Sequence, residues 1–89
     1  MEVIWDTKKA AANIRKHGIE FPHAATVLYD PMAVTIEDKS HDEQRFATIG
    51  ADLIGRILVV VYTYAGEEEI RLISARKATS KERTIYGEK

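Results

Sequence analysis

The sequence contains no cysteine and only two prolines among its 89 residues. Without thiols the chain cannot form disulfides, bind a metal through thiolates or use a cysteine nucleophile. Two prolines leave no room for a proline-rich linker, and the five glycines are scattered instead of forming a phosphate-binding loop. Packing alone must therefore stabilise the fold, and several familiar kinds of catalytic site are excluded.

Long hydrophobic runs are also missing. The longest, Ile57 to Tyr64, is interrupted only by Thr63 and is far shorter than the ~20 residues of a membrane-spanning helix. The N-terminus has Glu2 where a secretory signal would place a base. We therefore expect a protein with no membrane segment that acts in the cytoplasm.

The length favours one domain over residues 1–89, and 45% hydrophobic with 30% charged residues is typical of a globular chain. The formal net charge of −1 conceals a segregation of charge. Residues 1–18 hold four bases and two acids, residues 19–69 three bases and ten acids, and residues 70–89 six bases and two acids. If the two basic ends meet in space, they form a positive surface.

Local patterns predict an α+β domain in which two N-terminal helices precede a mainly antiparallel meander and a short C-terminal helix, with the helices on one face of the sheet. Asp6 and Gly18 bound the first helix, whose expected apolar stripe is Ala10, Ala11 and Ile14. Thr79 and Glu82 form a capping box for the last. The expected elements are a strand at 3–5, helices at 7–17 and from 22 to before 30, strands at 32–37, 44–50, 56–64 and 70–76 with a hairpin loop at 38–43, and a helix from 79 to about 86.

Arginines on the last strand are the first candidates for chemistry. Strict alternation along residues 71–76 places Arg71 on one face of the sheet and Arg76 on the other, each beside apolar residues. Guanidinium groups held on a rigid sheet can clamp phosphate oxygens in a bidentate manner. The alternative is that Arg71 is solvent-exposed and Arg76 lies at a frayed strand end.

Two further segments carry polar candidates. Glu43 and Arg45 flank the start of a strand, where they form either an exposed ion pair or a proton acceptor beside a charge stabiliser. Lys16 and His17 end the first helix, where basic residues are favoured electrostatically in any case. His17, His23 and His41 show no metal-ligand spacing, so we expect no metal site and no cofactor.

Matches to a known family follow one another in order along almost the whole chain. They are Trp5-Asp6, Lys9, Asn13, Lys16-His17-Gly18, Phe21 with Ala24, Glu43-Gln44-Arg45-Phe46, Val59-Val60-Val61, Ile70-Arg71-Leu72-Ile73-Ser74-Ala75-Arg76, Ala78, Glu82 and Tyr86. Through this ordered set the chain resembles the BrnT family of toxins from type II toxin–antitoxin systems.

The resemblance implies a RelE-like fold and a ribonuclease that cleaves RNA without a metal and thereby inhibits translation. It also implies a BrnA-like antitoxin with a ribbon-helix-helix domain, a heterotetrameric complex, and binding of operator DNA through the antitoxin to repress the operon.

Roles for individual residues follow from the resemblance as hypotheses. Arg71, Arg76 and Arg45 would stabilise charge on the phosphate, while Glu43 or His17 would transfer protons. The lysines expected to bind RNA are Lys16, Lys77 and Lys81. The competing hypothesis is a non-catalytic module that binds nucleic acid or protein in transcriptional regulation and cuts nothing.

Overall fold

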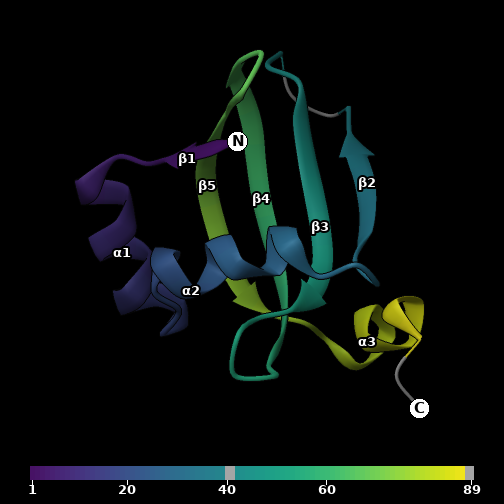
Figure 1. The fold of residues 1–89 in the computed structure, drawn as a ribbon. Helices are drawn as coiled ribbons and strands as arrows, with labels where there is room; N and C mark the ends of the chain where they lie inside the picture. Colours follow the sequence, from purple (N-terminus) through teal and green to yellow (C-terminus); the bar gives the residue numbers. More distant parts are fainter. Residues whose placement is uncertain (40–41, 88–89) are drawn as a thin grey trace.

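The computed structural model describes residues 1–39 and 42–87, which form an α+β domain (Figure 1). Along the chain the elements are β1 (Glu2–Ile4), α1 (Thr7–His17), α2 (Phe21–Thr26), the 3-10 turn η1 (Val27–Tyr29), β2 (Val34–Asp38), β3 (Arg45–Ala51), β4 (Ile57–Gly66), β5 (Glu69–Lys77) and α3 (Ser80–Tyr86). The sheet order is β1-β5-β4-β3-β2, antiparallel except where β1 pairs with β5. The α+β class and the meander are confirmed. Residues 40 and 41 of the predicted loop, including His41, and residues 88 and 89 lie outside the described residues.

Both capping signals in the sequence are realised. The Asp6 carboxylate accepts hydrogen bonds from two backbone N–H groups of the first turn of α1, the shorter at 2.7 Å. Gly18 ends the helix in the left-handed conformation with φ of 72°, which glycine adopts without strain. At α3 the side chains of Thr79 and Glu82 each accept from the other's backbone N–H, as a capping box requires.

The buried residue of α1 is not one that the apolar stripe predicted. Ile14 is 47% exposed, whereas Asn13 is 5% exposed. The Asn13 amide donates to the carbonyls of Ala75 and Ile19, both at 2.9 Å, and its Oδ1 accepts from the Ala75 N–H at 3.0 Å. Because β1 pairs with β5 only from Glu69 to Arg71, this side chain takes the place of a neighbouring strand farther along β5.

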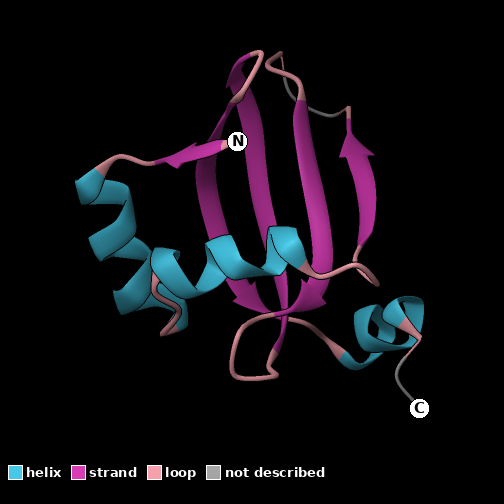
Figure 2. Ribbon diagram, viewed as in Figure 1, coloured by secondary structure: helices cyan, strands magenta, loops and turns pink. Residues whose placement is uncertain are grey.

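Helices lie on both faces of the sheet, so the expectation of a single helical face is wrong for α3. One cluster joins Phe21, Ala24 and Val27 to Leu58 and Val60 of β4. The alternate β4 residues, Ile57 and Val59, pack instead with Ile49, Ala78 and Tyr86. Since successive strand residues point to opposite faces, α3 packs against the face opposite α2, at the lower end of the sheet (Figures 1 and 2).

An extra residue in β5 changes the predicted alternation of its side chains. Val61 of β4 pairs with Ser74, but the next residue, Tyr62, pairs with Leu72, so Ile73 is inserted as a β-bulge. Burial agrees with this register, because Leu72 and Ala75, three residues apart, both lie in the α2-side core. The prediction that Arg71 and Arg76 occupy opposite faces is therefore wrong. They pair with Thr63 and Val59, which share the α3 side of the sheet.

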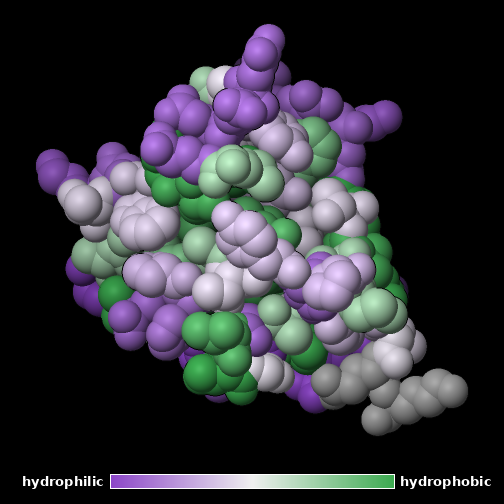
Figure 3. Space-filling model, in the orientation of Figure 1, coloured by the Kyte–Doolittle hydropathy of each residue, from purple (hydrophilic) through white to green (hydrophobic). Residues whose placement is uncertain are grey.

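The two ends of the molecule differ in surface chemistry. In Figure 3 hydrophilic residues gather at the upper end, toward the β4–β5 turn, and apolar residues gather low on the face that α2 crosses. Leu53 and Ile54 in the β3–β4 turn are 81% and 66% exposed. No helix in the described part of the chain has both the length and the apolar character needed to cross a membrane.

We predict that Asn13→Ala lowers the free energy of unfolding by about 3 kcal/mol, because it leaves buried backbone groups of Ala75 and Ile19 without partners. Urea denaturation measures the change. Arg15→Ala, an exposed position on the same helix, is the control and should change stability by less than about 0.5 kcal/mol. Equal stability of Asn13→Ala and wild type would contradict the role of this amide.

Candidate active site

The α3 side of the sheet carries the three arginines predicted to contact phosphate. Arg71 and Arg76 project from β5 to this side because of the bulge at Ile73. On β3, Arg45 alternates with Ala47 and Ile49, which pack in the α3-side cluster, so Arg45 shares this face. One face of the sheet therefore presents three guanidinium groups. They come from β3 and β5, the two strands that flank β4.

Glu43 bridges Arg45 and Arg71. One carboxylate oxygen lies 2.7 Å from Nη2 of Arg71, and the other lies 3.4 Å from Nε of Arg45. The side chains are 41%, 28% and 33% exposed for Glu43, Arg45 and Arg71, so solvent and ligands reach all three. We call these residues the Glu43 cluster. The structure thus brings together three of the five residues predicted to be catalytic.

Thr63, which sequence reasoning did not single out, holds the strands beneath this cluster. Its hydroxyl is buried and donates at 2.6 Å to the backbone carbonyl of Gln44, between Glu43 and Arg45. In the ladder Thr63 lies directly opposite Arg71. One residue of β4 therefore ties the start of β3 to β5 where Glu43 meets Arg71. A threonine inside a β-branched run gives no sequence signal for this role.

Arg76 has a different partner. Its two terminal nitrogens contact the two carboxylate oxygens of Glu82 at 2.7 and 2.8 Å. These hydrogen bonds lower the pKa of Glu82 from 4.5 to about 2 and raise the pKa of Arg76. The same carboxylate accepts the Thr79 N–H of the capping box. Sequence analysis used Glu82 only for that cap and missed that it occupies the guanidinium fork a phosphate would use.

The end of α3 is fastened by a second carboxylate. Asp30 accepts from the hydroxyl of Tyr86 at 2.6 Å and from the Ala51 N–H at 2.8 Å. The backbone bond from Ala51 is the main reason that the pKa of Asp30 is lowered, and the bond to Asp30 raises the pKa of Tyr86. Together with the Arg76–Glu82 pair, this contact fixes α3 at both ends.

Lys16 and His17 reach β5 from α1. With Lys9, Ala12 and Asn13 they line a hollow of about 280 Å³ whose other wall is Ile73 and Ser74. Ser74 pairs with Val61 and lies on the same side of the sheet as Arg71 and Arg76. The bases of α1 therefore lie beside β5, the strand that carries Arg71 and Arg76 of the second basic segment.

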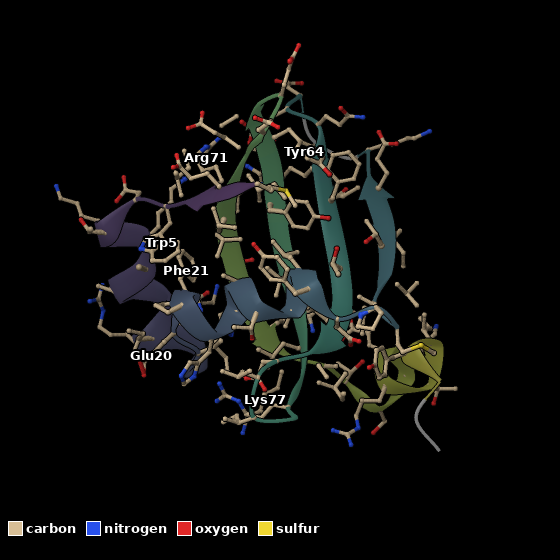
Figure 4. All side chains as sticks on the ribbon, viewed as in Figure 1. Trp5, Glu20, Phe21, Tyr64, Arg71 and Lys77 are labelled. Atoms are coloured by element: carbon tan, nitrogen blue, oxygen red, sulfur yellow. The ribbon has the colours of Figure 1, made fainter. Side chains whose placement is uncertain are left out.

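Lys77 and Lys81 lie apart from the Glu43 cluster. Figure 4 shows Arg71 and Lys77 toward opposite ends of β5, roughly 20 Å apart at ~3.3 Å per strand residue. Lys77 pairs with Leu58, on the α2 side of the sheet, and Lys81 is exposed on α3. That these lysines bind RNA stays a prediction. Among residues 1–39 and 42–87, no three His, Asp or Glu side chains are grouped as ligands for a metal ion.

Comparisons with known proteins agree on one family. A family model described as "Ribonuclease toxin, BrnT, of type II toxin-antitoxin system" matches residues 5–82. The crystal structure of the Brucella abortus ribonuclease toxin BrnT is similar, with a TM-score of 0.72 and 32% identity over 90% of this chain and 99% of that one. A search of curated protein sequences gave no match. The likeness to RelE folds stays a prediction.

Because the folded pKa of Glu82 lies below its unfolded value, the Arg76–Glu82 pair should stabilise the protein above about pH 4.5 and cease to do so as the pH falls toward 2. Glu82→Gln should therefore cost about 1–2 kcal/mol near pH 7, a figure reduced because Arg76 is 39% exposed. Denaturation of both proteins from pH 7 to pH 2 should show this difference shrinking. Glu67→Gln, at the β4–β5 turn, is the control, and a pH-independent difference for Glu82→Gln would argue against the pair.

Proposed function

The chain belongs to the BrnT family of ribonuclease toxins of type II toxin–antitoxin systems, and we propose that its Glu43 cluster cleaves RNA through the ribose 2′-OH. Family membership implies an RNA substrate and an antitoxin partner. The observation that carries the proposal is the pair of exposed guanidinium groups held by one exposed carboxylate on an open sheet face.

The cluster has the parts that this reaction needs. The 2′-oxygen attacks the adjacent phosphorus and its proton passes to the Glu43 carboxylate. Arg45 and Arg71 stabilise the negative charge that develops on the phosphorane oxygens. The bond from phosphorus to the 5′-oxygen breaks, and that oxygen takes up a proton, for which His17 is our candidate donor. The products are a 2′,3′-cyclic phosphate and a 5′-hydroxyl.

Glu43 also positions the arginines before RNA arrives. Arg71 contacts it through Nη2 and Arg45 through Nε, so other N–H groups of each guanidinium stay available to phosphate. Charges fixed in advance need no reorganisation during the reaction. Arg76 lies on the same face farther along β5, where the carboxylate of Glu82 offsets its charge.

The biological setting in our proposal is that of a translation inhibitor. The toxin acts in the cytoplasm without a metal cofactor. It is neutralised by a BrnA-like antitoxin with a ribbon-helix-helix domain in a heterotetramer, and the complex represses its own operon by binding operator DNA through the antitoxin. Family membership supports this setting, and the antitoxin's identity is tested by copurification.

We expect the pure protein to cleave labelled RNA in excess EDTA and to leave a 2′,3′-cyclic phosphate, detectable by mass spectrometry. An oligonucleotide with a single 2′-deoxyribose at the scissile position should resist cleavage, whereas one with the substitution several nucleotides away should not. Loss of activity in EDTA, or cleavage at the deoxy position, would refute the mechanism. Salt-sensitive binding without any cleavage would instead support the non-catalytic module.

Glu43→Gln and Arg71→Ala separate catalysis from binding. Glu43→Gln removes the proton acceptor and one negative charge, so cleavage should fall ~10²-fold or more while RNA binding is retained or tightened. Arg71→Ala should weaken both, because it removes a cation that contacts phosphate. Single-turnover cleavage and binding to an all-deoxy oligonucleotide give the two readouts, with Arg15→Ala as the charge control. Full activity in folded Glu43→Gln would exclude Glu43 as the acceptor.

A further inference from the structure

Of the residues that line the hollow between α1 and β5, only His17 has a role in the chemistry proposed above. Its volume of about 280 Å³ is close to the lower end of small-ligand pockets, ~300 Å³. The hollow exists because β1 stops pairing at Arg71 and Asn13 then holds α1 against β5 at Ala75. Between those two attachments, the bulge residue Ile73 and its neighbour Ser74 are left half-exposed.

The helix wall of the hollow is strongly basic. Lys9 and Lys16, seven residues apart on α1, line it together with His17. Neither lysine forms an ion pair within the described part of the chain, and no acidic side chain lines the hollow. This differs from the arginines of the sheet, which contact Glu43 or Glu82. Cations without such partners favour an anionic ligand.

The rest of the lining is apolar or neutral. Ile73 and Ala12 give it apolar surface, and the Ser74 hydroxyl adds a hydrogen-bonding group. A ligand that fits has a negative group for the lysines and a flat apolar part for Ile73. A single nucleotide, with its phosphate and its base, combines these two features.

The hollow also lies on the same strand as Arg71 of the proposed site of cleavage. Ser74 lines the hollow and faces the same side of the sheet as Arg71, three residues earlier, a separation of roughly 10 Å along the strand. We propose that the hollow binds the nucleotide next to the cleaved phosphodiester, with its phosphate between Lys9 and Lys16 and its base against Ile73. This subsite rests on the proposed ribonuclease function.

Removal of both lysines tests the subsite. Lys9→Ala/Lys16→Ala should weaken binding of an all-deoxy, uncleavable oligonucleotide at least about fivefold and lower the salt slope of log K by about 0.7, the value for one single-strand phosphate contact. The matched control is Lys8→Ala/Arg15→Ala, which removes the same charge at the same spacing from exposed positions outside the hollow. Equal loss in both double variants would overturn the subsite and indicate general electrostatic attraction.

A second pair of variants tests the hollow without removing a lysine. One of them introduces a negative charge into the hollow, and the other introduces the same charge outside it. Ala12 lies in the hollow and Ala11 is exposed outside it, and glutamate suits a helix at either position. Ala12→Glu should weaken oligonucleotide binding at least about fivefold, whereas Ala11→Glu should change it less than twofold. Urea denaturation of every variant shows that each is folded.

The outcomes separate this subsite from the proposed function. If wild type does not cleave RNA but the Lys9/Lys16 and Ala12 variants still lose binding, the ribonuclease proposal fails while nucleotide binding in the hollow stands. If wild type cleaves RNA and these variants match their controls, the subsite fails alone. If the variants keep RNA binding but escape neutralisation by the copurified antitoxin, the hollow is a protein contact and the nucleotide subsite is refuted.

Discussion

One inserted residue in β5 determines what this sheet can present on its surface. The bulge at Ile73 reverses the side-chain alternation, so that Leu72 and Ala75 both enter the core while Arg71 and Arg76 both face the opposite side. Without the bulge, Leu72 and Ala75 would lie on opposite faces of the sheet. Keeping either of them in the core would then turn one of the two arginines toward α2. Burying an unpaired guanidinium among apolar residues is costly, so the insertion and the site depend on each other.

The edge of β5 beyond its short pairing with β1 also needs hydrogen-bond partners. The amide of Asn13 pairs with both backbone groups of Ala75 and with the Ile19 carbonyl, and no buried side-chain nitrogen or oxygen in the described part of the chain is left without a partner. An apolar residue here could pack but could not satisfy that edge. Asn13 therefore holds α1 against β5 at Ala75, while a hollow remains between α1 and Ile73. This basic hollow lies beside the face of the sheet that carries the arginines.

Local chemistry predicted most element boundaries, because Asp6, Gly18 and the Thr79–Glu82 capping box act within a few residues of the ends they define. Features set by distant contacts were missed. Nothing near Ile73 in the sequence marks a bulge, since its register is set by β4 and by core packing. Polarity likewise suggested Ile14 over Asn13 as the buried residue of α1. Of the candidate site, the resemblance gave Glu43, Arg45 and Arg71 their roles, but it did not predict that they meet in space. The contact between Arg76 and Glu82 depends on which face of the sheet α3 covers.

The Arg76–Glu82 and Arg71–Glu43 contacts lie on one face of the sheet, but their geometry differs. Glu82 engages Arg76 through both oxygens, is also held by its capping box, and has a pKa of about 2, so a phosphate cannot easily displace it. Glu43 gives one oxygen to each of two arginines and is 41% exposed, so water weakens both contacts. The first pair anchors α3. The second is more exposed to solvent, and this contrast is why we propose the Glu43 cluster, and not Arg76, as the site of catalysis.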